Sequence, residues 1–138
     1  MIFVKTIVKK KRNQFMKGRI IMKRFYQGTL YDSDNAELID DYESDYPVND
    51  FNYFKEGLYR TPEGKFFLYG KGNAASKYAE RIEGNGAWAG GYDLIPLSTE
   101  EAKKWYEENL ERVYRDQDIT GAYETYCELF KHKGDNEK

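Results

Sequence analysis

The sequence predicts an α+β fold: an antiparallel sheet built from two hairpins plus an edge strand, packed by two C-terminal helices. Short strand-like runs separated by turn residues fill the chain from residue 24 to residue 97. After residue 98, two segments instead repeat apolar residues at three- and four-residue spacing, the period of an amphipathic helix. Each such helix needs an apolar surface to cover, and the sheet supplies it. A shorter segment, Ala74–Ile82, is expected to form two helical turns.

Two hairpins are expected in the first half of the chain. The first spans about residues 24–42 and turns at residues 32–35, where Asp, Ser and Asn side chains readily bond their own backbone. The second spans about residues 57–70. Its turn holds Pro62, which presets φ, and Gly64, which takes the left-handed conformation that closes a bulged hairpin. We therefore expect four antiparallel strands from these two hairpins.

An edge strand and two helices complete the predicted fold. Tyr92–Leu97 is expected at the edge of the sheet because its proline cannot donate to a ladder. A capping box of Ser98 and Glu101 begins the first helix, which is expected to run to about residue 114. The second helix is expected to start at about residue 119 and to end before Gly134, with a basic last turn of Lys131, His132 and Lys133 that suits the helix dipole.

Composition excludes several classes of protein. The chain has 138 residues, of which 17% are aromatic and 33% charged, and its mean hydropathy is −0.89. These values exclude a disordered chain and an integral membrane protein. Cys127 and His132 are the single cysteine and histidine, so neither an internal disulfide nor a Cys/His metal cluster is possible within one chain, and a reducing cytoplasm suits the protein best. Cys127 and Trp105 fall on the apolar faces of the predicted helices. Trp105 is interpreted as a core or interface residue, and Cys127 as an inert core thiol, with a nucleophile as the alternative.

Charge is strongly segregated along the chain. Every charged residue from 1 to 24 is basic, and every charged residue from 31 to 50 is acidic. Residues 1–21 are interpreted as a basic N-terminal extension or an added strand, and residues 22–138 as a single α+β domain. Such asymmetry is typical of a polyanion-binding arm beside an acidic surface. The alternative is that both blocks are solvated faces, or that they neutralise one another.

No catalytic or metal site is predicted. Asp32, Asp34, Asp40 and Glu43 fall at the first, third, ninth and twelfth positions of a calcium-loop register, but its fifth and sixth positions lack the oxygen ligand and the glycine. The same carboxylates have no evident apolar pocket to raise a pKa for acid/base work. We therefore expect no cofactor, no metal and no enzymatic activity.

Aromatic residues stand out in two turn-rich stretches. Phe51, Tyr53 and Phe54 precede the second hairpin, where they either pin the linker onto the sheet or bind a ligand. Tyr78 and Trp88 lie among glycines between the second hairpin and the edge strand. Large rings beside backbone without side chains indicate close packing or a recognition surface.

The stretch from residue 58 to residue 97 also carries a resemblance. LYRTPEGKFFLYGKG, then SKYAE, then GAWAGGYDLIPLSTEEAKKWYEENL resembles a family of small uncharacterised proteins encoded on phages, plasmids and conjugative elements of Gram-positive gut bacteria. The similarity covers roughly Lys23 to Leu110 and brings no catalytic residues with it. It implies a genomic context in which small proteins are often counter-defence factors, anti-CRISPR proteins among them.

The leading interpretation is therefore an inhibitor that binds a protein, most sharply a CRISPR effector nuclease whose basic nucleic-acid channel an acidic surface would occupy. We assign its partner-binding residues to the acidic tract and two of the rings: Asp32, Asp34, Asp40, Asp41, Glu43, Asp45, Tyr78 and Trp88.

The alternative interpretation is a small nucleic-acid-binding module. It would use the basic N-terminal arm for phosphates and exposed rings for base stacking. The rings proposed for stacking are Tyr26, Tyr59, Phe67 and Tyr69.

Overall fold

The computed structural model describes residues 22–131. The chain divides into two compact units, Met1–Pro96 and Leu97–Lys138, which we call the sheet unit and the helix unit and describe separately. The predicted extension over residues 1–21 and His132 lie outside the described residues. The elements are β1 (Lys23–Tyr26), β2 (Thr29–Asp32), β3 (Glu37–Glu43), β4 (Phe54–Arg60), β5 (Phe66–Gly72), β6 (Glu80–Arg81), β7 (Trp88–Ala89), β8 (Gly91–Leu97), α2 (Thr99–Val113) and α3 (Thr120–Phe130).

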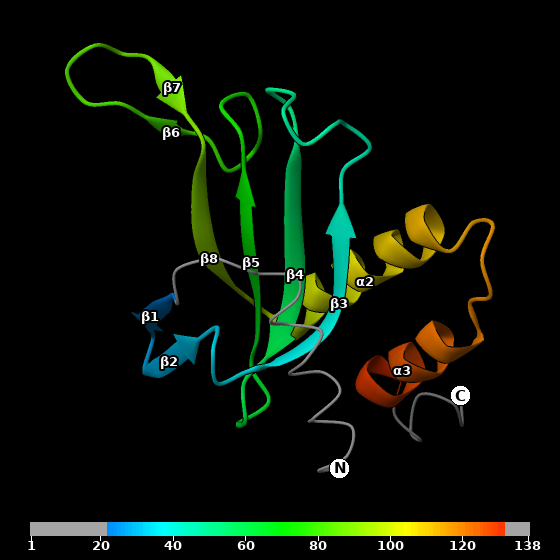
Figure 1. Ribbon diagram of the computed structural model, residues 1–138. Helices are drawn as coiled ribbons and strands as arrows, with labels where there is room; N and C mark the ends of the chain where they lie inside the picture. The colour runs from blue at the N-terminus through cyan, green and yellow to red at the C-terminus, as the bar shows by residue number, and fades with distance from the viewer. Residues whose placement is uncertain (1–21, 132–138) are drawn as a thin grey trace. The chain divides into compact units, whose positions relative to one another are not determined.

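The α+β class is confirmed: antiparallel sheets are followed by two C-terminal helices (Figure 1). The largest sheet has four strands in the order β3-β4-β5-β8, so β8 lies at an edge as predicted. The second predicted hairpin is also confirmed, since β4 pairs with β5 from Phe54↔Gly72 to Arg60↔Phe66. Its turn is closed by a 2.7 Å bond from the Thr61 amide to the Lys65 carbonyl, and Gly64 has a φ of +92°.

The first predicted hairpin is wrong in its pairing. β1 pairs with β2 in a separate two-stranded sheet, and β3 pairs with β4 instead. The reversal between β1 and β2 lies at Gln27 and Gly28, whose φ values of 48° and 82° are both positive, as a tight two-residue hairpin turn requires. The strand that was expected to run on through this point is therefore folded back on itself.

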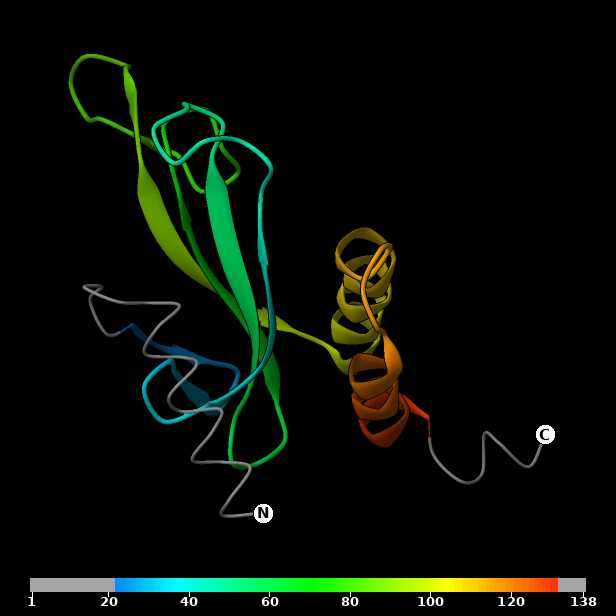
Figure 2. The same ribbon diagram turned by 45° about the vertical axis from the view of Figure 1, so that its right-hand side comes forward.

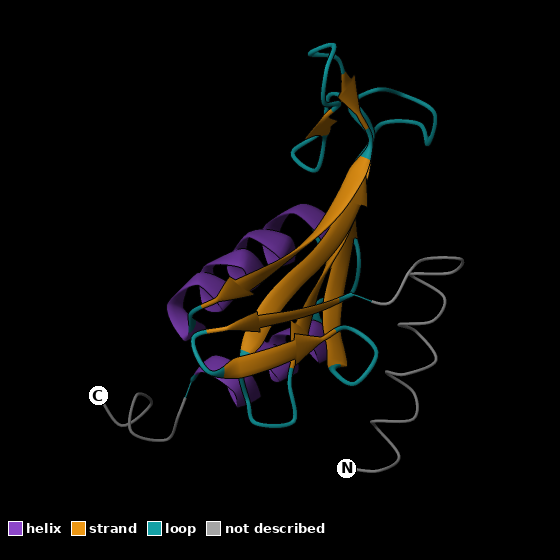
Figure 3. Cartoon of the chain, turned by 90° about the vertical axis from the view of Figure 1, so that its left-hand side faces the viewer, coloured by secondary structure: helices purple, strands orange, loops and turns teal. Residues whose placement is uncertain are grey.

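The core of the sheet unit is aromatic. Tyr59 and Phe67 are directly paired across β4 and β5, and their rings stack at 5.2 Å between centroids. Tyr31 from β2 meets Phe67 edge-on at 5.7 Å. The β1–β2 hairpin crosses one face of the four-stranded sheet (Figure 3), which explains how Tyr31 reaches this core. The buried residues of the cluster are Tyr31, Ala36, Leu38, Tyr59, Phe67, Tyr69 and Leu94.

The two predicted helices are present in the helix unit. Ser98 and Glu101 form the expected capping box of α2. The Glu101 amide donates to the Ser98 hydroxyl oxygen at 3.0 Å, and the Ser98 amide donates to the Glu101 carboxylate at 2.8 Å. The Tyr106 hydroxyl of α2 donates a 3.0 Å bond to the Ala122 carbonyl of α3. Trp105, which was expected in the core or at an interface, is buried within the chain. That the helices cover the sheet stays a prediction.

The predicted helical turns over Ala74–Ile82 are wrong. This segment forms turns followed by the short strand β6. Ser76 accounts for the difference, because its hydroxyl donates to the Asn73 carbonyl at 2.8 Å and accepts from the Tyr78 amide at 3.2 Å. A serine that bonds nearby backbone in this way stabilises a turn in competition with a helix.

Candidate protein-binding surface

Two loops are tied together at one end of the sheet unit. Asn73, just after β5, donates from its side-chain amide to the carbonyls of Val48 at 2.8 Å and Asp50 at 2.7 Å. Its backbone amide donates to the Tyr53 carbonyl at 2.9 Å, and the Ala75 amide donates to the Phe51 carbonyl at 2.8 Å. The β3–β4 loop is therefore held against the segment that follows β5 by four hydrogen bonds.

This held loop carries large apolar side chains that face solvent. The Phe51 side chain is 73% exposed, and Tyr46 and Val48 are also exposed. A loop with a fixed backbone that leaves a phenyl ring in water presents apolar area ready to be buried by a partner. The β6–β7 hairpin lies at the same end of the sheet as this loop (Figures 1 and 2).

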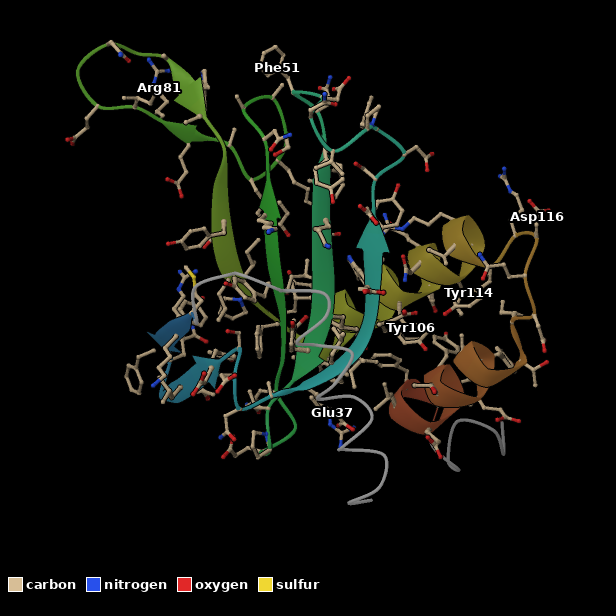
Figure 4. All side chains as sticks on the ribbon, viewed as in Figure 1. Glu37, Phe51, Arg81, Tyr106, Tyr114 and Asp116 are labelled. Atoms are coloured by element: carbon tan, nitrogen blue, oxygen red, sulfur yellow. The ribbon has the colours of Figure 1, made fainter. Side chains whose placement is uncertain are left out.

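The β6–β7 hairpin adds a second exposed ring. Trp88 is 52% exposed and is directly paired with Arg81, whose guanidinium lies 5.4 Å from the centre of the indole. Figure 4 shows Phe51 and Arg81 at this end of the unit and Glu37 at the other end of β3. Trp88 therefore stays a candidate partner-binding residue, joined by the exposed Ile82 and Tyr92.

A cavity of about 490 Å³ lies between the β3–β4 loop and β8. Its shape depends on glycine, because a Cβ at Gly90 would lie 2.8 Å from the Gly72 carbonyl oxygen and one at Gly91 would overlap the Glu80 side chain. The close approach of these backbones leaves a hollow bounded by aliphatic, aromatic and charged groups. Its lining comprises Met22, Val48, Tyr53, Lys71, Gly72, Asn73, Glu80, Gly90, Gly91 and Tyr92.

Tyr78, predicted as a partner-binding ring, is buried at 4% exposure and cannot contact a partner without unfolding its loop. Its hydroxyl donates a 2.6 Å bond to Glu56, which is itself buried, and the Lys77 ammonium lies 2.9 Å from the same Glu56 oxygen. Burial, together with the negative charge of Glu56, raises the pKa of Tyr78 well above its usual value. Tyr78 is therefore a structural residue in this unit.

The predicted acidic residues are spread along β3 and its flanking turns. Asp34, Glu43 and Asp45 are exposed and Asp41 is half-buried, so they face solvent to differing degrees. Asp40 is a correction, because it is only 3% exposed and cannot form part of an open surface.

Two of these carboxylates hold local structure. The half-buried Asp32 accepts a 3.0 Å bond from the Asp34 amide within the turn, and Glu43 accepts a 2.6 Å bond from the Tyr53 hydroxyl. Among residues 22–131, no three His, Cys, Asp or Glu side chains come together as a potential metal site. The acidic residues thus lie along β3 and the turns on either side of it, and they extend from one end of the sheet to the other.

The nucleic-acid interpretation loses three of its four stacking rings. Tyr59, Phe67 and Tyr69 are fully or almost fully buried, which corrects the expectation that they are exposed, while Tyr26 is exposed. Between residues 22 and 131 there are 22 acidic and 13 basic side chains, a net charge of −9 that repels phosphate. The basic arm lies outside the described residues.

Sequence reasoning missed the exposure of Val48 and Phe51. Phe51 belonged to a set of rings expected either to pin the linker or to bind, and only Tyr53 of that set is buried. The available signal was their position among Pro47, Asn49 and Asp50, since turn residues place apolar neighbours outside the core.

Comparisons with protein-family models, with curated proteins and with solved structures find no match to this chain. No helix within residues 22–131 is long and apolar enough to cross a membrane.

Proposed function

We propose that this protein is a counter-defence factor of a mobile genetic element that acts in the bacterial cytoplasm by binding another protein. In its sharpest form, the proposal is an anti-CRISPR inhibitor of a CRISPR effector nuclease. The observation that carries the protein-binding part is the exposed Phe51 and Val48 on a loop fixed by Asn73. The resemblance to mobile-element proteins supports the counter-defence part.

The charge of the described region indicates the kind of partner surface. Glu43 is the last residue of β3 and Asp45 lies at the start of the exposed apolar loop, and both are exposed. An apolar centre with an acidic rim is complementary to an apolar patch on a basic surface, and opposite charges at the rim speed association. A nucleic-acid channel of a defence nuclease is a surface of that kind.

Nucleic-acid binding remains the second candidate, supported by one observation. Residues 1–21 contain seven basic side chains and no acidic ones. The net charge of −9 between residues 22 and 131 opposes binding of a polyanion to the rest of the chain. Of the four rings proposed for stacking, only Tyr26 is exposed, so protein binding is favoured.

A pull-down from bacterial lysate containing candidate CRISPR effectors tests the proposal. It is done with and without nuclease treatment, using the wild type and two matched variants, Phe51→Ser and Phe25→Ser. Phe51 is 73% exposed and Phe25 is 72% exposed, so each variant removes an equally exposed phenyl ring. Phe25 lies on β1, outside the β3–β4 loop.

We expect an effector to be retained after nuclease treatment by the wild type and by Phe25→Ser, and to be lost with Phe51→Ser. Retention that disappears on nuclease treatment would favour nucleic acid. Equal loss of the effector with both variants would refute the assignment of binding to the β3–β4 loop.

A further inference from the structure

The two edge strands of the four-stranded sheet contain the same local hydrogen bond between a side chain and the backbone. β3 and β8 are the outer strands, and each contains an aspartate whose carboxylate accepts a bond from the next backbone amide. In β3 the Asp41 amide donates to Asp40 Oδ1 at 2.8 Å, and in β8 the Leu94 amide donates to Asp93 Oδ1 at 2.8 Å. Such repetition on two strands far apart in the sequence calls for a common explanation.

In β8 both backbone groups of one residue are occupied by side chains. The Leu94 amide is bonded to Asp93, and its carbonyl accepts a 2.8 Å bond from Arg24 Nη1 of β1. The amide and the carbonyl of one strand residue point to the same side of the strand. Both groups of Leu94 therefore point to the open edge of β8, the edge that an added strand would use. Pro96, two residues further on, points the same way and has no amide hydrogen to offer.

In β3 the direction of the backbone follows from its ladder. The Ser44 amide donates to the Phe54 carbonyl at 2.9 Å, so Ser44 faces β4. Hydrogen-bonding residues alternate along an antiparallel strand, and Asp41 therefore faces the outer edge. The Asp41 amide is the group that donates to the Asp40 carboxylate. The register of β3 also shifts between Leu38 and Asp40, and such bulges interrupt pairing at sheet edges.

We propose that Asp40 and Asp93, with Arg24, close both edges of this sheet to strand addition, so that neither a second copy nor a partner extends it. An open edge is a template for association, and occupied amides and carbonyls remove that template. If the protein-binding function proposed above holds, recognition then falls on side chains of the loops and not on the sheet edges.

The test uses Asp93 because its side chain is exposed, whereas Asp40 is buried and its removal would also disturb the fold. Asp93→Ala removes the acceptor, and Asp93→Asn keeps a side-chain oxygen without the charge. The double variant Arg24→Ala/Asp93→Ala removes the side-chain partners of both the amide and the carbonyl of Leu94. Backbone hydrogen exchange of Leu94 and the solution mass at increasing protein concentration are measured for the full chain.

We expect Leu94 to exchange about tenfold faster in Asp93→Ala, the factor that corresponds to loss of one such hydrogen bond. Asp93→Asn should exchange like the wild type, and the double variant should gain mass with concentration beyond the wild type. Unchanged exchange in Asp93→Ala, or no added association of the double variant, would overturn the proposal. Neither readout involves a nuclease, so the result stands apart from the counter-defence proposal.

Discussion

Tyr78 donates a hydrogen bond of 2.6 Å to Glu56, and both side chains are buried. This hydrogen bond holds the segment that follows β5 against the middle of β4. Lys77, beside it, reaches the same Glu56 oxygen at 2.9 Å, so the buried carboxylate has a donor and a positive charge. The Tyr78 ring lies over Gly70, the residue paired with Glu56 across the ladder.

Gly70→Ala should destabilise the protein by about 1–3 kcal/mol, the usual cost of overpacking a core. The added Cβ would lie 2.3 Å from the Tyr78 ring, and the ring is held by its bond to Glu56. Urea unfolding measures the change. Gly121→Ala is the control, because no atom lies within 4 Å of its added Cβ and alanine favours a helix. A loss of stability in the control as large as that in Gly70→Ala would contradict the steric explanation.

Stability should fall as the pH rises above 10. Burial, and then the bond to Glu107, raises the pKa of Tyr126 from 10.0 to about 12. Unfolded tyrosine loses its proton near pH 10 while the folded group keeps it, so the unfolded state binds fewer protons above that pH. The stabilisation is complete below pH 10 and is lost as the pH rises through about 12. Urea unfolding at a series of pH values should show a shallower fall for Tyr126→Phe, and an unchanged slope would disprove the assignment.

Trp105→Ala should cost about 3–5 kcal/mol, as expected for a buried large-to-small substitution. The indole is buried on α2, and the Arg112 guanidinium lies 5.4 Å from its centre. Thermal or urea unfolding followed by circular dichroism reports the loss. Lys104→Ala, at an exposed position next to it, should change stability by less than about 0.5 kcal/mol. A small effect of Trp105→Ala would mean that the ring packs less closely than its burial indicates.

Reversing the charge of Asp45 should weaken partner binding while leaving stability nearly unchanged, because exposed charges contribute little to folding. The measurement is inhibition of a responsive CRISPR effector by wild type and by Asp45→Lys over a range of salt concentrations. Wild-type binding should weaken with added salt, as opposite charges at a rim are screened. Equal inhibition by both proteins at low salt would remove Asp45 from the interface.

The local elements were predictable from the sequence because their signals are local. The Pro-x-Gly turn after Thr61 and the capping box at Ser98 each depend on residues within one turn of chain. The partner of β3 was not predictable in the same way, since alternation within a strand does not identify its neighbour. The turn at Gln27 and Gly28 pairs β1 with β2, and β3 pairs with β4.

The candidate surface was harder to predict than the fold. Tyr78 and Trp88 look alike in the sequence, as rings among glycines, yet one is buried over Gly70 and the other is exposed. Their difference depends on Glu56, which is distant in the chain and supplies a buried acceptor. Asp40 is buried for a comparable reason, because burial is decided by the tertiary position of β3 and not by its charge.

The contact between Gly70 and Tyr78 also constrains how this gene can change. Replacing Gly70 while Tyr78 is present costs stability, and a smaller residue in place of Tyr78 leaves Glu56 without its hydroxyl donor. Exposed side chains such as Phe51 and Asp45 are not subject to that constraint and can be exchanged one at a time. The exposed loop between β3 and β4 can therefore change sequence more readily than Gly70, Tyr78 and Glu56, whose substitutions depend on one another.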